Sequence, residues 1–245
     1  MWLNKNLILF LIVFFIIACH SNKNKLTYDQ IKNKFGGKYN DEGFITTFGE
    51  SPIDFHQAEN SAIINISKQI NSQIEHQYTS HENYIESKGK KNFQNEFLNI
   101  ISNLKLSTNF EHVELIKFDP DSYIKDKRCN YFVLGYLKRM DLYNLLLPKY
   151  NNETTKFISI SELISQNINE GNFKQVSDGL NEIKNHYSQI LKNTFEIYVI
   201  TKKYPIDKDK IEEIFLNAIS RVLEFKGSIT LYIPEFRHLF THYTE

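Results

Sequence analysis

The sequence predicts an α+β fold, in which a small sheet with packed helices is followed by an α-helical C-terminal region. Segments rich in β-branched and aromatic residues, bounded by glycine or turn residues, are typical of strands and lie mainly between residues 43 and 138. Beyond them, apolar residues recur at three- and four-residue spacing, which indicates amphipathic helices. At 245 residues, with 41% of them hydrophobic, the chain is long enough to bury a core.

The amino terminus has the features of a bacterial export signal. Lys5 supplies a positive charge, and residues 7–17 form an unbroken apolar run, shorter than the about twenty residues of a membrane span. The run ends in Ile-Ile-Ala before Cys19, which resembles the lipobox of bacterial lipoproteins, where an aliphatic and a small residue precede the lipid-bearing cysteine. We therefore expect residues 1–18 to be a signal peptide cleaved after Ala18, and Cys19 to be the lipid attachment residue. A plain membrane anchor with a chance cysteine is the less favoured alternative.

Residues 19–39 are predicted to be a lipidated tether and a short helix. Residues 20–25 are too polar to pack, and a helix is expected over 26–38, ended by a glycine pair. In the Gram-negative lipoproteins that this segment resembles, a residue other than aspartate after the cysteine favours sorting to the outer membrane. His20 therefore predicts an envelope protein anchored in the outer membrane.

Residues 40–148 are predicted to form an α+β domain with strands at 43–49, 112–118 and 130–138. The last of these strands is apolar or aromatic at nearly every position, which indicates a central strand covered on both faces. Turn-forming residues at 119–122 are expected to separate the second strand from the third.

Two amphipathic helices are predicted between the first and the second strand. Pro52 and Asp54 mark the start of the first helix, with Asp54 as its N-cap. We expect this helix to pack across the sheet. The apolar residues of both helices have helical spacing. They are Ala58, Ala62, Ile63, Ile66, Ile70 and Ile74 in the first helix, and Phe93, Phe97, Ile100, Ile101 and Leu104 in the second.

Pro148 marks the expected end of this domain, and residues 149–226 are predicted to be helical. Gly171 and Pro205 divide the region, and each part has an apolar stripe at helical spacing. The stripe of the long middle helix could instead be a coiled-coil seam, but about three heptads with helices on both sides favour packing within the chain. The final residues, 227–245, are predicted to be a strand followed by a tail.

Two segments have a distinctive pattern. The first has Phe-Ile-Thr-Thr-Phe-Gly-Glu at 44–50, followed by a helix with Ala58 and Ala62 and then Ile66 to Ile70. The second has Tyr-Phe-Val-Leu-Gly-Tyr-Leu-Lys-Arg-Met-Asp-Leu at 131–142. Both resemble the LPP-type lipoprotein family, named for a twenty-kilodalton antigen of a gastric bacterium, and the related module that begins the flagellar assembly protein T. The second segment is similar to the family's closing strand, although Gly135 stands where alanine is usual.

This resemblance covers residues 40–148. It implies the α+β module of an envelope lipoprotein, often with a helical extension like the one that follows here. The shared motifs are packing signatures, so the resemblance implies no catalytic or ligand-binding residues.

The sequence contains no motif of a phosphate-binding loop, a dinucleotide-binding fold, a nucleophile elbow or a zinc protease. His238 and His242 stand four residues apart and could share a helical face, as zinc ligands do, but surface positions are favoured because no third ligand is in range. His76 and His81 are expected in a polar loop or at a helix end. Neither a metal nor a cofactor is therefore expected.

Cys129 has no intramolecular partner if Cys19 is lipidated, because the chain has only two cysteines. It precedes the expected core strand and lies beside Arg128, so a partly buried, inert thiol is favoured over a redox-active or intermolecular one. Glu212 and Glu213 are expected on the solvent-exposed face of a helix.

Lys and Arg together number 29, as do Asp and Glu, so nucleic acid is not an expected partner. The sequence and the resemblance together predict a non-enzymatic envelope lipoprotein, tethered to the membrane through Cys19, that serves as a structural or binding module for other envelope proteins. The alternative is an exported hydrolase acting on a cell-wall or small-molecule substrate.

Recognition is expected in the helices of residues 153–225, with Tyr198 and Tyr204 among the exposed residues. Most of the apolar stripe of the long middle helix in this region is expected to be buried, namely Phe173, Val176, Leu180 and Ile183.

Overall fold

The computed structural model describes residues 28–87, 91–125 and 128–232. The fold is α+β with a helical C-terminal region, as the sequence predicts. Within the described ranges, no helix is long and apolar enough to cross a membrane.

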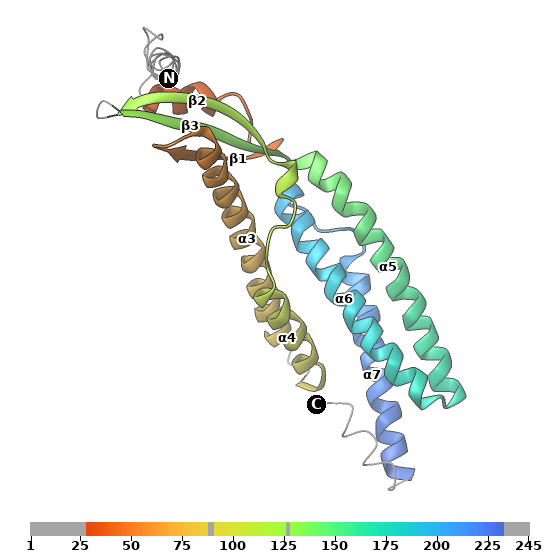
Figure 1. Cartoon of the computed structure of the whole chain (residues 1–245). Coiled ribbons are helices and arrows are strands. Elements are labelled where there is room, and N and C mark those ends of the chain that lie inside the picture. Colours follow the sequence, from red (N-terminus) through yellow and green to blue (C-terminus); the bar gives the residue numbers. More distant parts are fainter. Residues whose placement is uncertain (1–27, 88–90, 126–127, 233–245) are drawn as a thin grey trace, which may run out of the picture. The chain divides into compact units, whose positions relative to one another are not determined.

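The chain divides into two compact units, which share the long helix α3 (Figure 1). Of the described residues, those up to Gln69 and those within Glu111–Arg139 form the sheet unit. Those within Ile70–Phe110 and from Met140 to Tyr232 form the helical unit. Each unit is therefore assembled from separate stretches of sequence, and a single cut at Pro148 does not separate them.

The sheet unit contains a three-stranded antiparallel sheet in the order β1-β3-β2. Strand β3 is central, as predicted, with Phe44 opposite Lys138 on one side and Lys117 opposite Tyr136 on the other. The elements of this unit are α2 (Tyr28–Gly36), β1 (Phe44–Ser51), the first part of α3 (Phe55–Ser87), the 3-10 helix η1 (Val113–Leu115), β2 (Lys117–Lys125) and β3 (Arg128–Lys138).

Alternate residues of β3 face opposite sides of the sheet, and both sides are covered. On one side, Phe132 and Leu134 pack with Ile31 and Phe35 of α2, and the rings of Phe35 and Phe132 stack with centroids 6.2 Å apart. On the other side, Gly135 lies against Ala62 and Ile66 of α3. The predicted packing of this helix on the sheet is confirmed for Ile66, whereas Ile70 belongs to the helical unit.

Helix α3 begins where the sequence predicts. The Asp54 carboxylate accepts a hydrogen bond from the backbone N–H of Gln57 at 2.7 Å, so Asp54 caps one of the N–H groups that the first turn leaves unpaired.

The predicted second strand is wrong in position. Residues 113–115 form η1, and β2 begins only at Lys117 and continues through the residues 119–122 that were expected to form a turn. Because β2 lies at the edge of the sheet, it tolerates Pro120, which lacks an N–H group. The acidic residues beside that proline are held by lysines of α2 and the turn that follows it.

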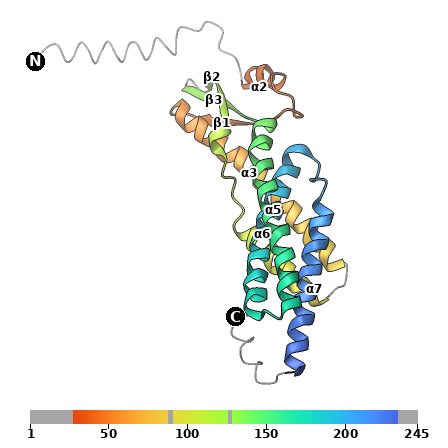
Figure 2. The ribbon, with the colours of Figure 1, turned by 90° about the vertical axis from the view of Figure 1, so that its right-hand side faces the viewer.

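The helical unit is built around aromatic side chains. Tyr187 and Phe215 stack with centroids 4.0 Å apart, and Phe97 meets both rings edge-on at 5.5 and 5.0 Å. Helices α5, α6 and α7 run alongside one another (Figure 2). The elements are the second part of α3, α4 (Lys91–Leu106), α5 (Arg139–Glu170), α6 (Phe173–Thr201) and α7 (Lys208–Tyr232).

The apolar stripe of α6 is buried as predicted for Val176, Leu180 and Ile183, whereas Phe173 is 37% exposed. Gly171, predicted to separate two helices, has a φ of 73°, a left-handed conformation that favours glycine. The intrachain packing that the stripe favours is therefore confirmed.

Two predicted boundaries in this unit are wrong. Helix α5 runs through Pro148 without ending, because Leu146 and Tyr150 on either side of the proline are both buried on one face. Residues 227–232, expected to be a strand, continue α7. Apart from its chain neighbours and the backbone of α7 itself, no atom of the described residues lies within 4 Å of where a Cβ on Gly227 would be, so this residue only weakens the helix, by about 1 kcal/mol. Residues 233–245 lie outside the described residues.

Candidate functional site

The residues predicted to anchor the chain, Ala18 and Cys19, lie outside the described residues, as do His238 and His242. The backbone of Cys129 forms part of β3, but its side chain lies outside the described part of the structure. The lipid anchor and the inert character of the Cys129 thiol therefore stay predictions.

His76 and His81 lie within α3, neither in a loop nor at its end. His76 is exposed, whereas the His81 ring is buried and meets Phe195 edge-on with centroids 5.6 Å apart. Its neighbour Tyr84 stacks on the same ring at 6.2 Å. His81 thus contributes to the packing of α3 against α6.

Glu213 is exposed as predicted, but the prediction for Glu212 is wrong, because it is only 6% exposed. The Lys208 ammonium lies 3.6 Å from the Glu212 carboxylate. Burial, and then the negative charge of Glu212, raise the pKa of the Tyr187 phenol. Successive side chains of a helix point about 100° apart, so Glu212 can lie at the edge of the core although its neighbour Glu213 faces solvent.

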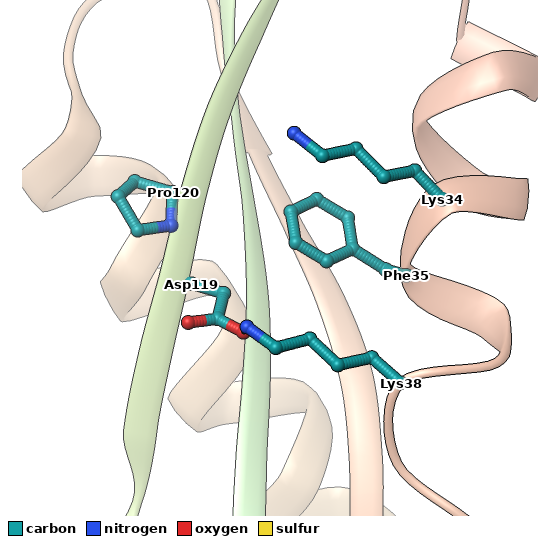
Figure 3. A pocket seen from close by; sticks show the side chains of 5 residues that line it. All are labelled: Lys34, Phe35, Lys38, Asp119 and Pro120. Atoms are coloured by element: carbon teal, nitrogen blue, oxygen red, sulfur yellow. The ribbon is translucent and has the colours of Figure 1, made fainter.

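A pocket of about 350 Å³ lies between α2 and β2 in the sheet unit (Figure 3). Lys34 and Phe35 project from α2, and Lys38 projects from the turn that follows that helix. Asp119 and Pro120 of β2 form the opposite wall. Figure 3 shows the Lys38 ammonium beside the Asp119 carboxylate.

The charges of this pocket are compensated inside the sheet unit. The Lys34 ammonium lies 2.9 Å from the Asp121 carboxylate, and the Asp119 carboxylate accepts hydrogen bonds from Lys38 and from the Tyr39 hydroxyl at 2.8 Å. Burial by itself raises the pKa of Asp119, but these two hydrogen bonds, together with the positive charges of Lys38 and Lys34, outweigh it and lower that pKa below its usual value. Burial, with contacts to Tyr136 and Asp119, raises the pKa of Tyr39. The arrangement fastens α2 to the sheet.

A second feature is the loop between α6 and α7, residues 202–207, which we name the α6–α7 loop. Lys202 has a φ of 58°, and its N–H donates to the carbonyl of Tyr198 at 2.7 Å, which closes the end of α6. The Tyr204 ring stacks on the Tyr198 ring with centroids 4.4 Å apart. Ile206, which follows Tyr204 in the chain and precedes α7, is fully exposed.

Tyr198 and Tyr204, the two tyrosines predicted to be exposed, therefore mainly stabilise this loop. Tyr204 is 42% exposed, but its hydroxyl donates to the Gln77 side chain at 2.7 Å. Tyr198 is half-buried. Ile206 is the residue that the sequence reasoning missed; the available signal was a single aliphatic residue within the lysine-rich run Lys-Lys-Tyr-Pro-Ile-Asp-Lys at 202–208.

Among the described residues, no group of three or more His, Cys, Asp and Glu side chains could hold a metal ion. None of the family models matches the chain, and no curated protein or solved structure matches it. A function must therefore be argued from the residues and geometry above.

Proposed function

We propose that the chain is a non-enzymatic lipoprotein of the bacterial cell envelope, held at the outer membrane by acyl chains on Cys19. It acts as a structural or binding module for other envelope components. The observation that carries this function is the amino terminus, where a charged start, an apolar run, Ala18-Cys19 and a polar tether follow one another in the order of a lipoprotein signal.

The packing of the sheet unit supports the proposed kinship with LPP-type lipoproteins. That resemblance rests on the glycine-ended strand, the alanine-bearing helix and the closing strand. In the structure these three segments pack against one another, since Gly49 of β1 and Gly135 of β3 both lie against the face of α3 that carries its alanines. The shared residues therefore have a common physical role, the close approach of a helix to a sheet.

The helical unit is the proposed recognition module, through residues of 153–225. Its core combines aromatic rings with many aliphatic side chains, and its outer faces combine polar residues with single exposed aliphatic residues, such as Leu163 at 55% and Leu223 at 41% exposure. Protein interfaces bury apolar side chains inside a polar rim, so these two residues are the positions at which recognition by this unit is tested.

The lipid anchor is tested by growing cells with a labelled fatty acid. Cys19→Ser should abolish labelling of the protein and leave an uncleaved precursor in the inner membrane. Cys129→Ser is the matched control, because it removes the other cysteine and should label like the wild type. Normal labelling of the Cys19→Ser variant would overturn the proposed tether.

Partners are best identified by crosslinking the intact protein in its native envelope. A truncation that removes residues 153–245 is a poor comparison, because Phe97 would lose both rings, Tyr187 and Phe215, that cover it. Leu163→Glu and Leu223→Glu instead change the surface of the helical unit and leave its core. Loss of a crosslinked partner in these variants supports recognition by this unit, and an unchanged set of partners contradicts it.

A further inference from the structure

The α6–α7 loop presents an aliphatic side chain to solvent on a firmly held support. Ile206 is fully exposed, and the backbone on each side of it is anchored. The Tyr204 hydroxyl donates to Gln77, and the Asp207 carboxylate accepts a hydrogen bond from Tyr150 at 2.6 Å. The Lys208 N–H also donates to the Pro205 carbonyl at 3.2 Å. The exposed position of Ile206 is therefore built into the fold of the helical unit.

Cations surround this aliphatic residue. Within residues 202–210 there are lysines at 202, 203, 208 and 210, against aspartates at 207 and 209. Lys203 and Lys210 are exposed. Asp207 is engaged by Tyr150, and Asp209 lies 3.6 Å from the Lys208 ammonium. Among the exposed charged side chains of residues 202–213, the lysines at 202, 203 and 210 stand against Asp209 and Glu213, so the loop and the start of α7 present a small excess of positive charge.

Tyr204 adds an amphipathic ring to the same loop. Its ring is supported by Tyr198, and the Lys208 ammonium lies 5.2 Å from the ring centroid. A single projecting aliphatic side chain, an aromatic ring with a polar end and long flexible cations match the boundary between lipid headgroups and acyl chains. There the apolar parts enter the acyl region while the ammonium groups stay among the headgroups.

We infer that the α6–α7 loop, together with the first turn of α7, is a second membrane-binding site, which takes an anionic lipid surface through Ile206 and Lys203 of the loop and Lys210 of α7. This inference rests on the proposed function in one respect, because the tether at Cys19 supplies the membrane at high effective concentration. A contact too weak to recruit a free protein can then hold a tethered one in a fixed orientation. The positive charge favours anionic over neutral lipid.

The chain offers a direct optical test, because its only tryptophan is Trp2, in the predicted signal peptide. In the chain from residue 19 onwards with Cys19→Ser, Ile206→Trp places the sole tryptophan at the loop tip. Leu106→Trp is the matched control, since Leu106 is also exposed, at 89%, and lies in α4 of the same unit. Both proteins are titrated with vesicles of phosphatidylcholine alone and of phosphatidylcholine mixed with phosphatidylglycerol.

We expect the fluorescence of the Ile206→Trp protein to shift to the blue with the mixed vesicles and to be quenched by brominated acyl chains. The control should show neither effect. Adding Lys203→Glu and Lys210→Glu should weaken the apparent vesicle affinity roughly tenfold or more. The same charge change at Lys149 and Lys174, on exposed positions of α5 and α6, should leave it unchanged.

An unshifted Ile206→Trp spectrum with the mixed vesicles, or a shift equal to that of Leu106→Trp, would overturn the loop contact. So would equal weakening by the two pairs of charge reversals. The titration needs no acyl chain on Cys19, so it can be read even if fatty-acid labelling refutes the tether. If fatty-acid labelling is normal but the vesicle titration shows no spectral shift, the loop contact is refuted and the tether is not.

Discussion

A Cβ atom on Gly49 would lie 1.9 Å from the carbonyl oxygen of Ala58 and 2.5 Å from the backbone nitrogen of Ala62. Strand β1 and helix α3 therefore approach each other so closely that only glycine fits at residue 49. The obstructing atoms belong to the backbone of a helix, so they cannot move aside as a side chain could.

Replacing Gly49 with alanine should force α3 away from the sheet and destabilise the sheet unit by about 3 kcal/mol, which chemical denaturation measures. Gly37→Ala is the control, because no atom of the described residues, its chain neighbours apart, lies within 4 Å of a Cβ at residue 37. Equal denaturation midpoints for the two variants would show that the close approach is not present in solution.

Burying a carboxylate under α3 provides a test of its packing on the sheet. Ile66 is fully buried against Gly135, so Ile66→Asp should cost at least about 3 kcal/mol and unfold the sheet unit. Ile64, two residues earlier on the same helix, is 52% exposed, and Ile64→Asp should be tolerated. Circular dichroism during thermal unfolding distinguishes them, and similar melting of both variants would place Ile66 at the surface.

The hydrogen bonds to Asp119 should make the stability of the sheet unit depend on pH. Because the pKa of folded Asp119 lies below its usual value of 3.8, its ionised form stabilises the fold. That contribution is present above the usual pKa and is lost as the pH falls below it. Asp119→Asn should therefore cost about 1 kcal/mol at neutral pH, and its difference from the wild type should shrink in acid.

Glu42→Gln is the matched control for this pH dependence, since it removes one exposed carboxylate from the same unit. Denaturation curves at neutral and acidic pH measure both variants. A constant difference between Asp119→Asn and the wild type across this range would contradict the role given to Asp119.

The elements that sequence could predict are those whose local pattern agrees with their burial. Strand β3 is apolar on both faces, and Asp54 caps α3, which has a regular apolar face. The position and the packing of these two elements therefore follow from nearby residues. Strand β2 could not be placed this way. Its Asp119-Pro120-Asp121 segment is typical of a turn, but its backbone pairs with β3 from Lys117 to Lys125. Its carboxylates are held by Lys34 and Lys38, more than eighty residues earlier.

The division into units was also beyond local reasoning. Ile66 and Ile70 lie one turn apart on one uninterrupted helix, yet they belong to different units. The apolar stripe of α3 identifies the buried face but not what covers it. The exposure of Ile206 likewise depends on residues distant in sequence, since Gln77 and Tyr150 hold the loop on either side of it.

The central claim is that the mature protein begins at a lipid-bearing Cys19, and intact mass spectrometry of the protein purified from the envelope tests it most directly. The account predicts a chain that lacks residues 1–18 and carries the additional mass of a diacylglyceryl group on its first residue. A fragment spectrum should place that mass on Cys19. A mature chain that begins elsewhere, or an unmodified Cys19, would contradict it.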